Sequence, residues 1–367
     1  MVWRKIALKG RNLELKRMNG CERFISALRK EEPDRVPIWE LIVNQPVVEG
    51  IMGAGGTYVD LCNHLDLDGV TCGEDQRLSW ISGDEYTDEW GIRWRVGAGG
   101  LSYPVGGPIR DKEDITSYEA PDPDADWRLK TLEEFVRRFK GKRAIVFLGH
   151  ESFEFSHYLV GGMRKLFLLY AREPDYAFRL ADIISRYKLA VMERAVEVGA
   201  DVLLTGDDYC NAHGPFMRPE QFRKFVLPYL ERAVGCARKM GVPFIKHTDG
   251  YLWPIIGDLV NCGIDGLHPI EPAARMDIGE VKSKFGGRIC VIGNIDCSYI
   301  LSMGSLEEVR VAVKKVIAKA SPGGGHIISS SNSIHPGVKP ENFLEMVRVA
   351  KECGKYPIDE KLIKEFS

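Results

Sequence analysis

A histidine and an aspartate two residues apart follow a short apolar run of this 367-residue chain. The run is Val242–Ile245, and His247 and Asp249 come soon after it. An apolar run of this length bounded by glycine and proline is typical of a buried strand. Positions i and i+2 at the end of an extended strand point the same way. An imidazole and a carboxylate so placed form either an acid–base pair or two ligands of a metal ion such as Zn²⁺.

The sequence offers further groups that could complete a zinc site with His247 and Asp249. The candidates are Asp207, Asp208, Glu151 and Cys210. Asp207 and Asp208 follow the apolar run DVLLT, and two carboxylates close together raise one another's pKa. One of the two is therefore a candidate proton donor or a hydrogen-bonding group for a substrate hydroxyl. The alternative is a surface pair or a helix N-cap.

Polar residues follow all the apolar runs that we interpret as strands. They are Glu40, Glu74, His150, Glu151, Asp207, Asp208, His247, Asp249, His268, Asn294, Asp296, Asn332 and His335. In parallel α/β folds ligands bind at the carboxyl ends of the strands, so these groups should converge on one rim. Among them, Glu40, Glu151, His268, Asn294, Asn332 and His335 are expected to contact a substrate, the two asparagines through hydrogen bonds because they do not titrate.

Eight strands are expected near residues 38, 70, 146, 203, 244, 267, 290 and 327, with helical segments between most of them. Eight β/α units in about 330 residues favour a (β/α)8 TIM barrel, an α/β fold, over a doubly wound sheet. Helices are expected at Cys21–Lys30, before the first strand, and at Pro174–Val198, Pro219–Met240, Leu252–Cys262, Ser305–Ala320 and Asn342–Lys351. One domain over residues 1–367 is the economical interpretation.

Residues 76–142 are expected to form an insertion between the second and third strands. Glu89–Val96, the GAGG turn and Leu101–Val105 predict a β-hairpin. Such a long excursion is either a small subdomain or a lid. Its aromatic residues, Trp80, Trp90, Trp94 and Tyr103, either bind a ligand or fill a minor core.

Several residues and one motif are assigned structural roles. His64, His157 and His326 are expected to be structural, and His213 is expected to pack or cap a turn. The PGGGH run precedes the last strand instead of following it, so a tight turn at the bottom of the barrel is favoured over a phosphate site.

The composition excludes some classes of partner. A formal charge of −2 and a pI of about 6.5 give no reason to expect nucleic acid or an anionic membrane. Nine scattered cysteines without a CxxC pair suit a reducing cytoplasm. No apolar run approaches the roughly 18 residues of a membrane span, and the N-terminus lacks the features of a secretion signal. A cytoplasmic location is expected.

The chain resembles the uroporphyrinogen decarboxylase superfamily and, within it, the corrinoid-dependent methyltransferase branch. The resemblance covers about residues 20 to 357. It rests on RFISALRKEEPDRVPIWE, GDDYCNAHGPFMRPEQFRKFVLPYL, KHTDGYLWPIIGDLVNCGIDGLHPIEP, GRICVIGNIDC and SSSNSIHPGVKPENFLEMV. Taken together these stretches are specific for the superfamily and less so for an activity.

Two departures from the family pattern narrow the expected activity. Family decarboxylases carry an arginine-rich motif near the first strand, where this chain has Pro37–Glu40 with Arg35 as the nearby arginine. An acidic rim would also repel a porphyrinogen with eight carboxylates. Thiol-methylating members hold zinc with His-x-Cys and a later Cys, where this chain has His247, Asp249 and Asn332.

The resemblance then implies a demethylating enzyme of the O-demethylase type. It would pass a methyl group from a small methoxylated aromatic donor to the cob(I)alamin of a separate corrinoid protein. His247, Asp249 and Asp208 would protonate the departing oxygen or coordinate it through Zn²⁺. Trp39, Trp80, Trp90 or Tyr251 would hold the aromatic ring. The resemblance is compatible with a homodimer.

Two other functions remain open at this stage. The first is a decarboxylation or another acid–base reaction on a small acid, without a corrinoid protein. The second is a non-catalytic barrel that binds a corrinoid or tetrapyrrole, against which the density of titratable groups on one rim argues.

Overall fold

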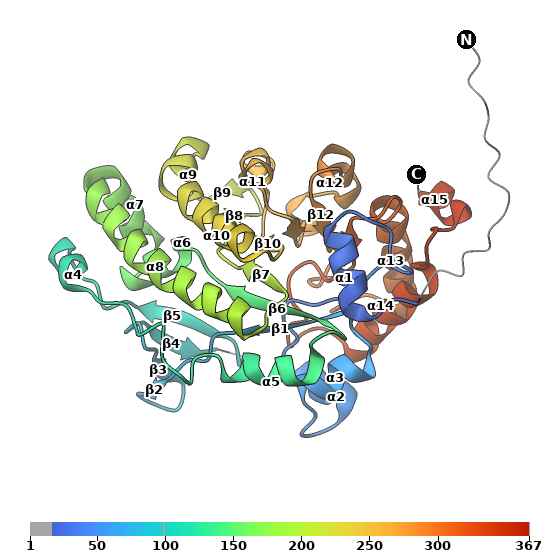
Figure 1. Ribbon diagram of the computed structural model, residues 1–367, viewed down its shortest axis with the longest axis horizontal. Coiled ribbons are helices and arrows are strands. Elements are labelled where there is room, and N and C mark those ends of the chain that lie inside the picture. Colours follow the sequence, from blue (N-terminus) through green and yellow to red (C-terminus); the bar gives the residue numbers. More distant parts are fainter. Residues whose placement is uncertain (1–16, 98–99, 367) are drawn as a thin grey trace, which may run out of the picture.

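The computed structural model describes residues 17–97 and 100–366, and within these ranges its centre is a parallel sheet of seven strands. In spatial order they are β1 (Gly69–Gly73), β6 (Ala144–Gly149), β7 (Val202–Thr205), β10 (Phe244–His247), β11 (Gly266–His268), β12 (Cys290–Ile292) and β13 (His326–Ile327). Spatial order follows chain order, so each crossover joins neighbouring parallel strands (Figure 1).

The segment Val36–Glu40 closes this sheet between its two edges. Ile328, beside β13, exchanges hydrogen bonds of 2.9 and 3.1 Å with the segment. On the other side, Asp68 N–H donates to Ile38 O at 2.9 Å, directly before β1. The strand expected near residue 38 therefore completes the eight positions, and the predicted (β/α)8 barrel is confirmed.

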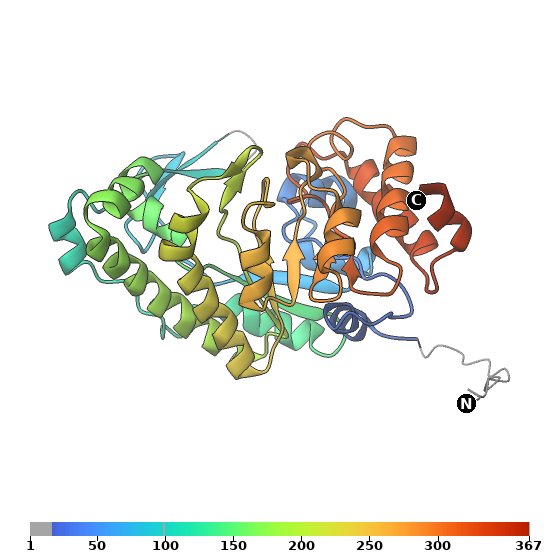
Figure 2. The same cartoon turned by 90° about the horizontal axis from the view of Figure 1, so that it is seen from above.

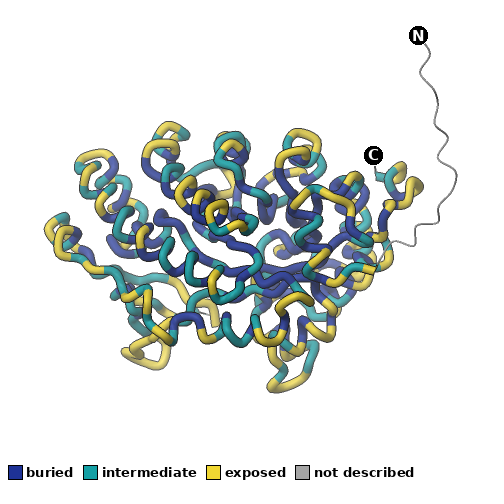
Figure 3. Tube along the Cα trace, viewed as in Figure 1, coloured by how far each residue is buried: buried dark blue, intermediate teal, exposed yellow. Residues whose placement is uncertain are grey.

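Helices surround the strands. Before the insertion come α1 (Gly20–Leu28), α2 (Gln45–Met52) and α3 (Tyr58–His64). The helices from the end of the insertion onward are α5 (Lys130–Phe139), α6 (Phe153–Leu159), α7 (Met163–Arg172), α8 (Pro174–Val198), α9 (Pro219–Phe225), α10 (Leu227–Met240), α11 (Ile256–Cys262), α12 (Ile278–Phe285), α13 (Leu306–Ala320), α14 (Pro340–Cys353) and α15 (Glu360–Phe366). Figure 3 shows buried strands at the centre and exposed turns at the periphery.

Most expected helices form, and two differ from the prediction. The helix expected over Pro219–Met240 is broken at Val226 into α9 and α10, because Pro228 lies in the first turn of α10. The helix expected from Leu252 begins only at Ile256. A capping box begins α13, with Glu308 N–H donating to the Ser305 hydroxyl.

The predicted N-terminal helix, α1, closes the amino end of the barrel. Cys21 N–H donates to Lys142 O, just before β6, at 3.1 Å. Phe24 and Leu28 of α1 are fully or almost fully buried in one apolar cluster with inward-facing strand residues such as Ile245. The barrel interior is therefore plugged at this end, and its carboxyl end is where the binding site of such a barrel is expected.

The insertion is a four-stranded antiparallel sheet, which is larger than the predicted hairpin. Its strands are β2 (Ser79–Trp80), β3 (Glu85–Thr87), β4 (Arg93–Val96) and β5 (Ser102–Gly106), and a short helix, α4 (Lys112–Ser117), follows. The predicted hairpin corresponds to β4 and β5. The insertion and the C-terminal helices lie at opposite ends of the long axis of the molecule (Figures 1 and 2).

The aromatic residues of the insertion differ in how far they are buried. Trp90 is buried and packs against Phe155 and Tyr187, with ring centroids 4.9 and 4.7 Å away. Trp80 and Tyr103 remain exposed on the sheet. Trp90 therefore anchors the insertion to the barrel helices and does not bind a ring at the barrel mouth.

Two of the expectations concern residues outside the ranges 17–97 and 100–366. Residues 1–16, on which the expectation about a secretion signal rests, and residues 98–99 of the GAGG turn lie outside the described residues. In the ranges 17–97 and 100–366, none of the helices has the length and apolar character that a bilayer span requires.

Candidate active site

Two histidines lie side by side at the carboxyl end of the barrel. β10 and β11 are paired so that His247 is directly opposite His268. In a parallel ladder, residues in register project to the same face, and here the two Nδ1 atoms are 2.7 Å apart. Both rings are buried, with exposed fractions of 5% and 0%. Register between two strands therefore joins histidines that are 21 positions apart in the sequence.

Two carboxylates lie on the other side of the His247 ring. Its Nε2 is 3.8 Å from Asp208 Oδ1 and 3.7 Å from Asp249 Oδ1. Asp249 N–H donates to Asp208 Oδ1 at 2.9 Å, and Asn332 Nδ2 donates to Asp249 Oδ2. Asp249 Oδ1 is buried, and the described residues offer it no hydrogen-bond donor. The predicted neighbours His247, Asp208, Asp249 and Asn332 are thus brought together.

The charges of this cluster are those that a divalent cation would need. Burial and the neighbouring Asp208 raise the pKa of Asp249 well above its usual range, and burial also raises the pKa of Asp208. Burial lowers the pKa of His247 to about 3, so its imidazole is neutral. A neutral imidazole and two carboxylates balance the charge of a divalent ion.

The donor atoms also fit the geometry of zinc. Three protein ligands from histidine and carboxylates match a catalytic zinc site with an open fourth position. Ligand atoms about 2.1 Å from a tetrahedral zinc lie about 3.4 Å from one another. The two separations from His247 Nε2, 3.7 and 3.8 Å, are a few tenths of an ångström longer than this, and all three ligand atoms lie within 4.8 Å of one another.

The other aspartate of the pair, Asp207, has a structural role in place of the predicted role of proton donor or substrate-binding group. It is fully buried and accepts hydrogen bonds from His150 Nδ1 at 2.9 Å and Ser152 N–H at 3.0 Å. Burial alone would raise the pKa of Asp207, but the His150 hydrogen bond and the nearby positive charges hold it well below its usual range. Asp207 therefore fixes the loop before α6, and Asp208 is left as the candidate for chemistry.

Two residues expected to contact a substrate are sealed inside the protein. Trp39 is 0% exposed, and its Nε1 donates to Thr71 Oγ1 at 2.9 Å. Glu151 is paired with Lys246 at 2.9 Å in a buried contact. Both expectations are corrected: Trp39 fills the barrel interior, and Glu151 neutralises a buried ammonium group.

Glu40 and His268, also expected to contact a substrate, lie behind His247. His268 Nε2 is 3.2 Å from Ser329 Oγ, which donates to Glu40 Oε2 at 3.3 Å. Both residues are 0% exposed, so neither reaches a substrate directly. Burial raises the pKa of Glu40 to about 8.

The remaining expected residues surround the cluster. Tyr251 is half-buried, with the Arg275 guanidinium 4.9 Å from its ring centroid. Asn294 Nδ2 donates to Ile270 O at 2.8 Å, and Asn294 lines a separate cavity of about 270 Å³. His335 Nε2 is 3.1 Å from Cys297 O, which is a loop contact.

Two groups beside the cluster were missed by the sequence reasoning. Glu154 Oε1 accepts Asp208 N–H at 3.3 Å, and burial raises the pKa of Glu154 well above its usual range. Glu154 lies on α6, and its spacing of four residues from His150 is the signal for it in the sequence. Ser329 is the other, and the serine run before Asn332 is its only signal.

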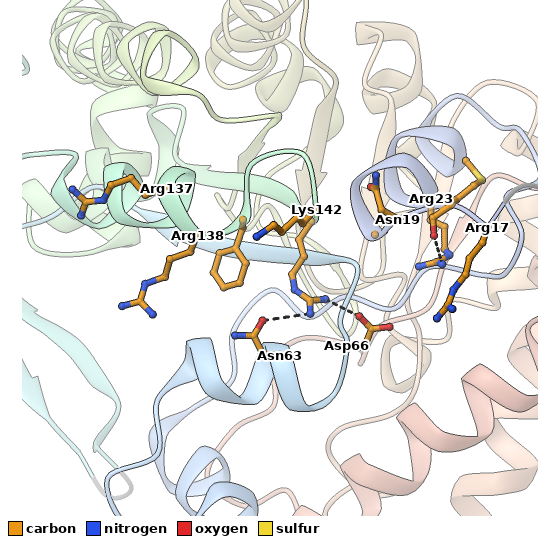
Figure 4. A pocket seen from close by; sticks show the side chains of 12 residues that line it. Arg17, Asn19, Arg23, Asn63, Asp66, Arg137, Arg138 and Lys142 are labelled. Atoms are coloured by element: carbon orange, nitrogen blue, oxygen red, sulfur yellow. Dashed lines mark hydrogen bonds and ion pairs between the residues drawn. The ribbon is translucent and has the colours of Figure 1, made fainter.

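A larger pocket, of about 720 Å³, lies at the other end of the barrel (Figure 4). Its walls include segments that precede β1 and β6, with Asp66 and Lys142 among them. Arg143 pairs there with Asp66 at 3.3 Å, while Arg137 and Arg138 line the pocket from α5. This pocket holds none of the predicted catalytic residues and is separate from the histidine–carboxylate cluster.

Comparison with known proteins agrees with this barrel. The sequence model of the uroporphyrinogen decarboxylase (URO-D) family matches residues 90–353, which is more than half of the chain. The chain belongs to the uroporphyrinogen decarboxylase family. The protein is accordingly an enzyme of this superfamily, as the resemblance in the sequence implied.

Relatives in this family are similar over nearly their whole length. The chain is 26% identical over 358 residues to the uroporphyrinogen decarboxylase of Thioalkalivibrio sulfidiphilus, covering 91% of this chain and 98% of the relative. It is 24% identical over 349 residues to that of Alkalilimnicola ehrlichii, covering 89% and 92%. Among solved structures, a methyltransferase from Methanosarcina mazei superimposes with a TM-score of 0.73 at 20% identity, over 91% of this chain and 99% of that one. This last likeness concerns the fold.

Proposed function

We propose that this family member transfers a methyl group from a small methoxylated aromatic compound to the cob(I)alamin of a separate corrinoid protein. The observation that supports it is the cluster of His247 Nε2, Asp208 and the buried Asp249 Oδ1 at the carboxyl end of the barrel. The reaction cleaves the O–CH3 bond and forms a methyl–cobalt bond. The donor oxygen leaves with the electron pair of the broken bond and gains a proton.

His247, Asp249 and Asp208 would hold a zinc ion in this proposal. When bound, such an ion acts as a Lewis acid that stabilises the negative charge developing on the departing oxygen. The protein keeps His247 neutral, so that its Nε2 can be a ligand. Asn332 fixes Asp249, and the backbone N–H of Asp249 fixes Asp208.

Fewer residues remain as candidates for contact with the aromatic ring than the sequence suggested. Trp39 and Trp90 are buried, so two of the expected aromatic residues remain candidates for contact with a ring: Trp80, which is exposed on the insertion, and the half-buried Tyr251, two residues after Asp249. Alignment of the methyl carbon with the cobalt nucleophile is the main task of such an enzyme. The corrinoid protein would approach from the open carboxyl end, since α1 plugs the other one.

The surroundings of the cluster favour this reaction over decarboxylation of a porphyrinogen. Arg35, the arginine near the first strand, is engaged by buried Asp68 at 2.6 Å. The cluster instead presents Asp208 and Asp249, with Glu271 close by. Burial and the charge of Asp208 raise the pKa of both Asp249 and Glu271. A polycarboxylate would meet like charge there.

A second candidate is decarboxylation of a small acid. The names of the curated relatives favour the reaction type, since those proteins are uroporphyrinogen decarboxylases, and the small acid is the substrate expected from the sequence. This reaction releases carbon dioxide in the absence of a corrinoid protein, so the two candidates differ in a measured product.

The proposal is tested by the variants His247→Ala and Asp208→Asn in a methyl-transfer assay, with the zinc content measured on the same samples. Both should lose zinc and methyl transfer. His64→Ala is the matched control, because His64 is exposed on α3 and should retain both. Undiminished methyl transfer in both site variants would contradict the proposed role of His247 and Asp208.

A further inference from the structure

A chain of hydrogen bonds runs from His247 away from the barrel mouth. His247 Nδ1 is 2.7 Å from His268 Nδ1, and His268 Nε2 is 3.2 Å from Ser329 Oγ. Ser329 Oγ is 3.3 Å from Glu40 Oε2, where the chain ends. All four residues are buried. The chain crosses from β10 through β11 to the segment that closes the barrel.

The groups around Glu40 set the direction of donation at this end. Ser330 N–H, which can only donate, is 2.9 Å from Glu40 Oε1, so that oxygen must accept. Ser330 Oγ donates to Oε2 at 2.6 Å, and Ser329 Oγ donates to the same atom. A neutral Glu40 carries its proton on Oε2 and donates it in a hydrogen bond to Ser330 Oγ, which at 2.6 Å is nearer than Ser329 Oγ at 3.3 Å. Ser329 then still donates to Glu40.

The direction then passes along the chain by elimination. A Ser329 hydroxyl that donates to Glu40 must accept from His268, so His268 carries its proton on Nε2. The Nδ1 of neutral His268 therefore accepts, and the short contact of 2.7 Å requires His247 to donate from its own Nδ1. The lone pair of His247 is left on Nε2, which faces Asp208 and Asp249.

We propose that Glu40 is a positioning residue that acts through Ser329 and His268 to fix the tautomer of His247 with its Nε2 lone pair turned toward Asp208 and Asp249. The use of that lone pair for a metal rests on the proposed function, whereas the tautomer is a property of the metal-free protein. The arrangement has a clear purpose for metal binding. Two carboxylates alone would attract a proton to Nε2 and so block the ligand atom.

Replacement of Glu40 by glutamine should reverse the chain. The glutamine oxygen must take the Oε1 position, because Ser330 N–H has to donate to it. The amide NH2 group then occupies the Oε2 position and donates to both serine hydroxyls. Ser329 must in turn donate to His268 Nε2, which moves the His268 proton to Nδ1. His247 would then accept at Nδ1 and carry its proton on Nε2.

The experiment is long-range ¹H–¹⁵N correlation spectroscopy of the histidine rings in metal-free protein. We expect His247 protonated on Nδ1 in the wild type and on Nε2 in Glu40→Gln. His326 is an internal reference, since its Nε2 is 3.0 Å from Gly293 O and its Nδ1 is 2.8 Å from Ser321 Oγ. Its tautomer, Nε2–H, should not change. The same His247 tautomer in both proteins would overturn the proposal.

A second pair of variants tests the proposal independently, in case Glu40→Gln does not fold. Ser329→Ala removes the hydroxyl and should lose the Nδ1–H preference of His247, whereas Ser329→Thr keeps a hydroxyl and should retain it. Zinc affinity, measured by competition with a chelator, should fall about 10- to 100-fold in Glu40→Gln and Ser329→Ala. Ser329→Thr should bind zinc like the wild type. Equal behaviour of the alanine and threonine variants would contradict the proposal.

The two proposals fail separately in these measurements. Wild-type protein that shows the expected tautomer and binds no zinc would remove the metal from the proposed function and leave the role of Glu40 standing. Zinc binding by a protein whose His247 tautomer does not depend on Glu40 would do the reverse.

Discussion

Replacement of Asp249 by asparagine should have opposite effects on the metal-free and the metal-bound protein. Asp249 Oδ1 is buried without a hydrogen-bond donor from the described part of the chain, while Oδ2 accepts from Asn332. In Asp249→Asn, the amide oxygen can keep the Asn332 contact, and the amide NH2 group then faces His247 Nε2. The variant thus fills the empty hydrogen-bonding position and removes a metal ligand.

The expected size of both effects follows from the burial of this group. Relief of one buried, unsatisfied oxygen is worth about 1–3 kcal/mol. With an unfolding entropy of about 2 cal/mol/K per residue, the 367 residues convert this gain to about 1–4 °C in Tm. Zinc at about 100 times its Kd stabilises a binding protein by about 2.7 kcal/mol, or roughly 4 °C here.

The assay is thermal unfolding with a chelator and with zinc. Asp249→Asn should melt above the wild type in the chelator and should not respond to zinc, whereas the wild type should rise. Asp84→Asn, at an exposed site in the insertion, is the control and should follow the wild type. A lower Tm of Asp249→Asn in the chelator, or an undiminished zinc response, would refute the argument.

Three further outcomes are expected. Because burial raises the pKa of Glu40 to about 8, its contribution to the free energy of unfolding is complete below about pH 4.5 and is lost as the pH rises through 8. In denaturant unfolding without metal, the free energy of unfolding of Glu40→Gln should rise relative to that of the wild type by up to about 5 kcal/mol between about pH 4.5 and 8. Parallel pH profiles of the two proteins would contradict this. Lys246→Met leaves buried Glu151 unpaired and should cost about 3–5 kcal/mol in the same assay, with most of it recovered in the double variant with Glu151→Gln; no recovery would count against the pairing. Trp39→Phe loses the bond to Thr71 and should cost about 1 kcal/mol, with no change in KM for the methyl donor; a raised KM would restore Trp39 to the binding site.

The barrel could be predicted because its strands are short and begin with apolar runs. Val202–Thr205 and Phe244–His247 are buried at every position, as strands covered on both sides must be. The closing segment near residue 38 has the same character, although it forms only isolated pairings. The break at Val226 was missed although the sequence carries a signal for it, since Pro228 lacks the backbone N–H donor that a continuous helix would need there.

The site was predicted in part because strand ends are visible in the sequence. His247 and Asp249 were placed together by their spacing. The sequence does not show which way each side chain turns beyond the strand end, and a shift of one residue reverses it. Asp207 and Asp208 are neighbours, yet Asp207 is 0% exposed and fixes a loop, while the Asp208 side chain is 34% exposed near His247.

The contact between His247 and His268 was hidden for a different reason. It depends on the register between β10 and β11, which no local pattern fixes. Glu40 and Ser329 are separated by 289 positions and meet only because the barrel closes. A buried serine carries no charge and gives little signal by itself, so the chain behind His247 emerges from the structure alone.

The most direct test of the central claim is an anaerobic assay with cob(I)alamin on a corrinoid protein and a panel of methoxylated aromatic compounds. Formation of methyl–cobalt is followed by absorbance, and the zinc content is determined on the same sample. We expect methyl–cobalt to form with at least one donor, to require bound zinc and to be absent in His247→Ala. Folded, zinc-containing protein that methylates no corrinoid across the panel, and releases carbon dioxide from a small acid instead, would contradict the methyltransferase proposal.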